Sequence, residues 1–178
     1  MVAMNISRLS LSYDAPEDRL RMAVGDSGGH TLGLWLTRRL TMGVVAMMRG
    51  CLEGSSAVAG RTLPNLRGSV MAIEHVALSA HRTGEDGPPV RVQEPGIVVT
   101  GVNLRRKGRG YVLLFFAAEQ ELAVMRLDQR MLHRFAGALV AKMQEAVWTT
   151  GFDPDWLGKK AAAATGPGRK KRTTWGQS

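Results

Sequence analysis

The sequence predicts an α+β protein in which two β-β-β-α units pair as an intramolecular pseudo-dimer. Three observations lead to this fold class: three short segments alternate apolar and polar residues, a helix-spaced apolar stripe follows them, and the same order returns 91 residues later. Alternation indicates half-buried strands, and apolar residues three or four apart indicate an amphipathic helix. Each unit is therefore expected to be a three-stranded antiparallel meander followed by a helix.

The first unit is expected over residues 6–53, with strands at 6–13, 19–24 and 31–36. Thr37 has the residue type and position of a helix N-cap. Aligning the inward rows of the three strands places Ser12, Arg21 and Trp35 side by side on the outer face. The helix stripe should consist of Leu40, Val44, Met48 and Leu52.

The second unit is expected over residues 96–148 and repeats this layout. Asp128 takes the N-cap place of Thr37, and the equivalent stripe is Met131, Phe135, Leu139 and Met143. Residue identity between the units is at the level of chance. An old duplication and a coincidence of two similar units are therefore both open.

The linker 54–95 joins the two units and should contain one extra helix near residues 65–81. The strand at 111–118 reads YVLLFFAA and is apolar on both faces. An antiparallel strand of this kind needs a cover on its outer face. We expect the extra helix to supply it, with a dimer interface as the alternative. Residues 1–157 should then form a single globular domain, and 158–178 a flexible basic C-terminal tail.

The charge is unevenly distributed along the 178 residues, whose formal net charge is +9. The tail alone has six basic residues and no acidic one. The equivalent first hairpin turns of the two units have opposite charge. We call them the acidic turn, with Asp14, Glu17 and Asp18, and the basic turn, with Arg105, Arg106, Lys107 and Arg109.

Three interpretations of the basic turn are open. A charged turn can be a hydrated element that prevents edge-to-edge strand pairing. It can also be a finger that contacts phosphates. In the third interpretation it meets the acidic turn of a second copy, in a head-to-tail contact.

Several classes of protein are excluded by composition. The single cysteine, Cys51, excludes a disulfide framework and a multi-thiolate metal site. No apolar run approaches the roughly 18 residues that span a bilayer, and no secretory signal is recognisable, so a cytoplasmic protein is expected.

The histidines do not form a recognisable site. His75 and His81 do not share a helix face, and Glu74 with His81 would provide too few ligands for a metal. His133 is expected to be half-exposed beside the second helix stripe. We predict no catalytic residue, no metal and no cofactor, and hence no enzyme.

The favoured function is non-enzymatic nucleic-acid binding, directed to single strands or to structure. Trp35 beside Arg21 suits stacking of an unpaired base, but equally a cation–π contact under a loop. The alternative is a protein–protein adaptor or assembly factor that uses the apolar strand, the Met-rich first helix and the charged turns; its partner would be an acidic protein surface or a second copy. The predicted nucleic-acid-binding residues are Arg105, Arg106, Lys107, Arg109, Arg21, Trp35, Lys170, Lys171, Arg172 and Trp175.

Overall fold

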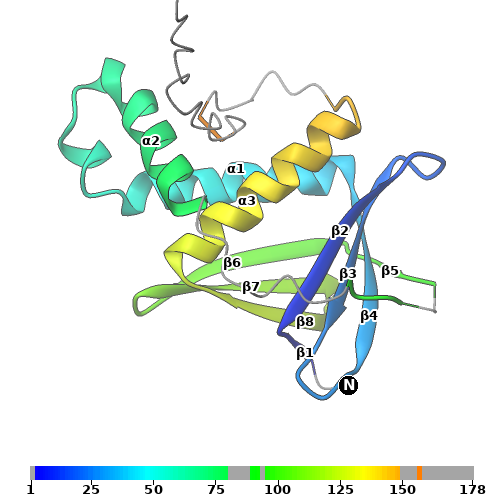
Figure 1. The fold of residues 1–178 in the computed structure, drawn as a ribbon. Coiled ribbons are helices and arrows are strands. Elements are labelled where there is room, and N and C mark those ends of the chain that lie inside the picture. Colours follow the sequence, from blue (N-terminus) through cyan, green and yellow to red (C-terminus); the bar gives the residue numbers. More distant parts are fainter. Residues whose placement is uncertain (1–2, 80–88, 93–94, 149–155, 158–178) are drawn as a thin grey trace, which may run out of the picture.

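The computed structural model describes residues 3–79, 89–92, 95–148 and 156–157. Within these residues the chain forms strands, three α-helices and two short 3-10 turns (Figure 1). In chain order the elements are β1 (Met4–Ile6), β2 (Arg8–Asp14), β3 (Arg19–Gly25), β4 (Thr31–Thr37), α1 (Arg38–Ser55), η1 (Ala59–Arg61), η2 (Pro64–Leu66), α2 (Arg67–Ser79), β5 (Ile97–Val98), β6 (Gly101–Lys107), β7 (Gly110–Ala117), β8 (Gln120–Leu127) and α3 (Gln129–Glu145).

The strands form two four-stranded sheets, which confirms the α+β class. We call β2-β3-β4-β5 the first sheet and β1-β8-β7-β6 the second sheet. The antiparallel meander expected in each half is present, and Ser12, Arg21 and Trp35 are neighbours across the first sheet as predicted. The prediction of three strands per sheet is wrong. Each meander gains a parallel strand from the other half of the chain, because β1 pairs with β8 and β5 pairs with β4.

The two added strands occupy matching registers. Ile6 lies opposite Met125, and Ile97 lies opposite Leu34, so both members of one pair are 91 residues from their counterparts in the other. The single strand predicted at 6–13 is divided at Ser7, whose backbone N–H donates to the Gly25 carbonyl oxygen at 2.9 Å. The chain passes there from the second sheet to the first.

Both main helices begin where the sequence places them. The Thr37 hydroxyl accepts a hydrogen bond from the Leu40 N–H at 3.3 Å, and the Asp128 carboxylate accepts one from the Met131 N–H at 2.7 Å. Each cap satisfies a backbone donor that has no partner within its helix. The stripe predicted for α3 is wrong at its first position, since Met131 is 42% exposed and Leu132 occupies the core instead.

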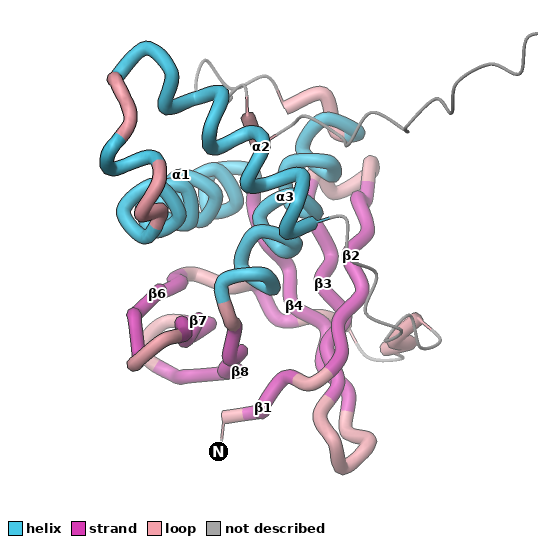
Figure 2. Tube along the Cα trace, turned by 60° about the vertical axis from the view of Figure 1, so that its left-hand side comes forward, coloured by secondary structure: helices cyan, strands magenta, loops and turns pink. Residues whose placement is uncertain are grey.

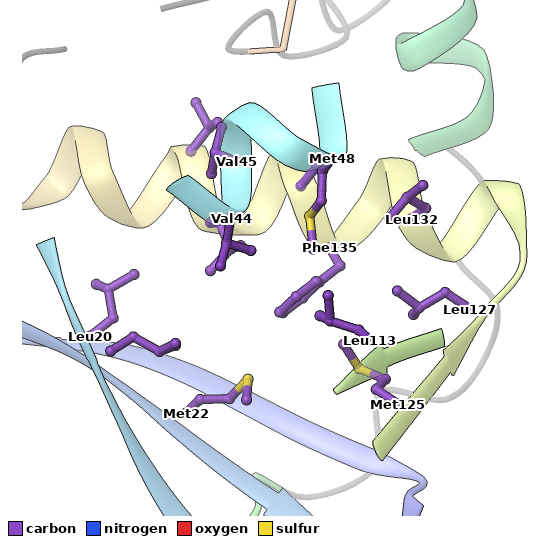
Figure 3. Close-up of a cluster of buried hydrophobic side chains, with 14 of the residues drawn as sticks. Leu20, Met22, Val44, Val45, Met48, Leu113, Met125, Leu127, Leu132 and Phe135 are labelled. Carbon is purple, nitrogen blue, oxygen red and sulfur yellow. The ribbon is translucent and has the colours of Figure 1, made fainter. Parts of the chain in front are cut away.

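The core lies between the helices and the inner faces of both sheets (Figure 2). Helix α1 of the first half packs against β6 of the second, and α3 of the second half packs against β2 of the first. Figure 3 shows the resulting mixture of side chains from α1, α3 and both sheets, with Met22, Met48 and Leu113 among the fully buried ones. Because each burial contributes roughly 1.5–3 kcal/mol, the two halves stabilise one another through this shared core.

The extra helix is present as α2, but the prediction that it covers the outer face of β7 is wrong. It packs against α3 and the 3-10 turns instead, and Met71 and His75 are buried there. Ile73, on the opposite side of the helix, is 70% exposed. No helix in the described ranges is long and apolar enough to cross a membrane.

Candidate functional site

The basic turn is the tip of the β6–β7 hairpin, where all four cationic side chains are exposed. Lys107 pairs with Gly110, so the connection is the two residues Gly108 and Arg109. Gly108 has a φ of +61°, in the left-handed region that glycine adopts without strain. A glycine at the first central position of a two-residue turn is a favoured hairpin chemistry, and it brings the neighbouring cations together.

Gly110 is required by a close approach between backbones. A Cβ atom at this position would lie 2.8 Å from the Leu127 carbonyl oxygen at the end of β8. Any side chain there would push β7 away from β8. The geometry of the hairpin therefore accounts for the glycines on both sides of Arg109, but it does not require the four cations.

The charge of the basic turn is not neutralised within the described part of the chain. None of its four side chains has a hydrogen bond or ion pair to a residue placed by the structure. A fifth cation joins them across the outer face, because Arg105 lies opposite Val112 and Val112 lies opposite the exposed Arg126. Five positive charges thus gather at one end of the second sheet.

The acidic turn, at the tip of the β2–β3 hairpin, differs from the basic turn because it packs against Trp148, just after the end of α3. The Asp18 carboxylate accepts hydrogen bonds from the Trp148 indole N–H at 2.7 Å and from the Tyr13 hydroxyl at 2.9 Å. The two rings meet edge to face with centroids 5.8 Å apart. Asp18 has a φ of +47°, a left-handed conformation that Asp tolerates better than most residues.

These contacts shift two titrations at the acidic turn. The hydrogen bond from Trp148, followed by that from Tyr13, lowers the pKa of Asp18 because both stabilise its ionised form. The hydrogen bond to Asp18 is the largest cause of a raised pKa for Tyr13. The Glu17 Oε2 atom also lies 3.7 Å from the Arg19 Nη1 atom, in an ion pair. The Asp14 carboxylate accepts a hydrogen bond from the Glu17 N–H at 3.1 Å, so each acidic side chain of this turn has a partner within the same chain.

The predicted Arg21–Trp35 pair is formed, with the Arg21 Cζ atom 5.7 Å from the centroid of the Trp35 ring. A linker segment that we call the crossing segment (residues 89–92 and 95–96) lies over it. The Val90 N–H donates to the Ser10 hydroxyl at 2.9 Å, and the Arg21 guanidinium donates to the Val92 carbonyl oxygen at 3.1 Å. This arrangement favours the interpretation of a cation–π contact beneath a loop.

The crossing segment reaches Trp35 itself at Gly96. A Cβ atom on Gly96 would lie 2.7 Å from the Trp35 indole nitrogen, so only glycine allows this approach. The outward residues Ala23 and Gly33 are buried, and Val92 lies close to Gly33. Small side chains on the outer face of the first sheet thus make room for the chain's own segment.

The outer face of the second sheet has large side chains and no such cover from the described residues. Val112, Leu114 and Phe116 follow one another along β7, with Val124 beside Leu114, and all four are half-buried. No side chain on this face is hydrogen-bonded to a described residue outside the sheet. Figure 1 shows the three helices on the opposite side of this sheet.

The structure also contains a buried histidine pair that the sequence did not reveal. The Nδ1 atoms of His75 on α2 and His133 on α3 are 3.2 Å apart, and the Trp156 ring packs edgewise on both imidazoles. The prediction that His133 is half-exposed is wrong, because α2 covers it. Burial, with the nearby His75 as a lesser cause, lowers the pKa of His133 to about 4.

The remaining predicted sites give little chemistry. Lys170, Lys171, Arg172 and Trp175 lie outside the described residues. Cys51 is half-buried, and burial raises the pKa of its thiol. Across the described ranges, no three His, Cys, Asp or Glu side chains are placed to hold a metal ion. No protein-family model and no curated protein matches this chain.

Proposed function

We propose that this protein binds nucleic acid without catalysing a reaction, and that the basic turn is its phosphate-contacting element. The observation that carries the proposal is the cluster of Arg105, Arg106, Lys107 and Arg109 on an exposed two-residue hairpin, together with Arg126. A bound polyanion would relieve the repulsion among these like charges. The acidic turn is engaged by Trp148, which argues against the head-to-tail contact as the purpose of the basic turn.

Charge reversal at the basic turn tests this proposal. The variant Arg105→Glu/Arg106→Glu/Lys107→Glu should weaken binding to duplex and single-stranded oligonucleotides alike. It should also flatten the salt dependence, since each lost phosphate contact removes about 0.9 from the slope on duplex and about 0.7 on single strands. Fluorescence anisotropy between low and physiological salt measures both quantities. A wild-type protein without affinity for any oligonucleotide at low salt would refute the proposal.

A second candidate, a protein–protein adaptor, is favoured by one separate observation. The solvent side of α2 and the turn before it expose Leu63, Leu66 and Ile73, which continue with Val70 and Ala77 at alternating spacings of three and four residues. Apolar residues at this spacing form the seams of helix–helix contacts. Binding through this surface would depend little on salt, so the same titration separates the two candidates.

We also propose that the two halves form an intramolecular pseudo-dimer with exchanged first strands. Three features support it: the matching registers of β1 on β8 and β5 on β4, the caps at Thr37 and Asp128, and the reciprocal packing of α1 on β6 and α3 on β2. A pseudo-dimer has two equivalent outer sheet faces. In this chain the crossing segment covers the outer face of the first sheet. The basic turn lies at the end of the second sheet, whose outer face the described residues leave uncovered.

A further inference from the structure

We infer that the outer face of the second sheet is a platform for the bases of single-stranded nucleic acid, an inference that rests on the proposed function. The sequence placed the stacking group at Trp35 on the first sheet. The crossing segment lies over that position in the structure. The equivalent face of the second sheet has an apolar track of Val112, Leu114 and Phe116 that no described segment crosses.

The track begins directly at the cationic end of the sheet. Arg105 and Arg126 flank Val112 from the neighbouring β-strands. A single-stranded oligonucleotide whose phosphates contact these two arginines would place its next bases over Leu114 and Phe116. Alternate residues of a strand are about 6.8 Å apart and point to the same side, which aligns the three side chains along β7. Phosphate contacts at one end thus lead onto an apolar surface at the other.

The borders of the track supply polar groups suited to base edges. Asn103 on β6 lies opposite Leu114, and Asn5 on β1 lies opposite Val124, so an amide is present on both sides of the central apolar pair. Neither side-chain amide has a hydrogen bond to a described residue. Gly101 lies opposite Phe116 on β6, so the residue paired with Phe116 in that strand contributes no side chain beside the ring.

Single-stranded nucleic acid is the occupant that fits these features. The positive charge at the start of the track complements phosphates, and unpaired bases stack on apolar and aromatic side chains whatever their sequence. A duplex keeps its bases stacked inside and offers no exposed base face to the side chains of a sheet. Duplex binding should therefore use the basic turn but not the track.

Substitution of Phe116 tests the inference with a 20-nucleotide oligo(dT) and a mixed-sequence duplex of the same length as probes. Phe116→Ala should weaken oligo(dT) binding by roughly 5- to 150-fold, the loss expected for one stacked base, and change duplex affinity by less than about twofold. Phe116→Tyr retains the ring and should retain affinity. Trp35→Phe is the matched control on the covered face and should change neither affinity.

The possible outcomes distinguish this inference from the proposed function. If Phe116→Ala binds oligo(dT) as tightly as wild type while the charge-reversal variant does not, the platform is wrong and the proposed function stands. An equal loss on both probes would also overturn the platform, because it would indicate a general structural defect. If wild type binds neither probe, the proposed function itself fails. Thermal melting of each variant verifies that it is folded.

Discussion

The acidic and basic turns occupy equivalent places in the two halves, yet the chain uses them in opposite ways. The acidic turn is docked: Asp18 accepts hydrogen bonds from Trp148 and Tyr13, and Trp148 is only 4% exposed. The basic turn projects from the second sheet without any described partner for its four cations. Hairpins at the same place in two meanders therefore need not make the same contacts, because the contacts of each turn depend on which residues from elsewhere in the chain lie beside it.

The outer faces of the two sheets repeat this contrast. Ala23 and Gly33 on the first sheet are small and lie beneath the crossing segment. The residues 91 positions later, Leu114 and Val124, are larger and lie side by side on the outer face of the second sheet. In both comparisons the first half makes contacts with described residues of the same chain, and the second half makes none of this kind.

The largest expected effect comes from removing the anchor of the acidic turn. Trp148→Ala should reduce the free energy of unfolding by about 3–5 kcal/mol, because a buried indole is lost together with its packing on Tyr13. Urea denaturation measures the change. Arg109→Ala at the basic turn is the matched control and should remain within about 0.5 kcal/mol of wild type. Equal losses at the two turns would contradict the contrast between them.

Acid should destabilise the buried histidine pair and the acidic turn in separate pH windows. The folded-state pKa of His133 is lowered to about 4, so the unfolded state takes up this proton first as the pH falls below about 6.5. The free energy of unfolding should therefore decline between about pH 6.5 and 4, by about 2–3 kcal/mol from His133. The lowered pKa of Asp18 stabilises the fold above its unfolded value of 3.8, and this contribution is lost only at lower pH.

Urea denaturation across pH 3–7 resolves the two windows. His133→Leu should flatten the decline above pH 4 and leave the acid limb of Asp18 in place. Asp18→Asn should remove the decline at lower pH and leave the decline between pH 6.5 and 4 in place. A stability profile that is flat between pH 6.5 and 4 in the wild-type protein would be inconsistent with a buried neutral histidine pair.

The smallest expected effect tests the covered face against the uncovered one. Gly96→Ala would place a methyl group 2.7 Å from the Trp35 indole nitrogen and should destabilise the protein by about 1–3 kcal/mol through overpacking. Gly101→Ala is the control on the second sheet, where the added Cβ atom meets only the Phe116 Cβ at an ordinary 3.9 Å. Thermal melting should show a lower melting temperature for the first variant only.

Local patterns in the sequence were sufficient to predict the meanders, the caps and the helices. The register that aligns Ser12, Arg21 and Trp35 follows from the alternation of side chains, and Thr37 and Asp128 cap helices through their own short side chains. The opposite charges of the two turns were likewise readable from composition. These features depend on residues close together in the chain, where periodicity and side-chain chemistry act directly.

Which of these surfaces are in contact with the rest of the chain depends on packing between distant segments. The exchange of β1 and β5, the burial of His133 under α2, the docking of Asp18 on Trp148 and the cover over Trp35 all join residues far apart in the sequence. Such contacts depend on how complete helices and strands pack together, and the residue periodicity within one segment does not predict them. The strands, caps and charges of each half thus follow from its own residues, whereas packing between the halves decides which turn and which sheet face the described residues cover.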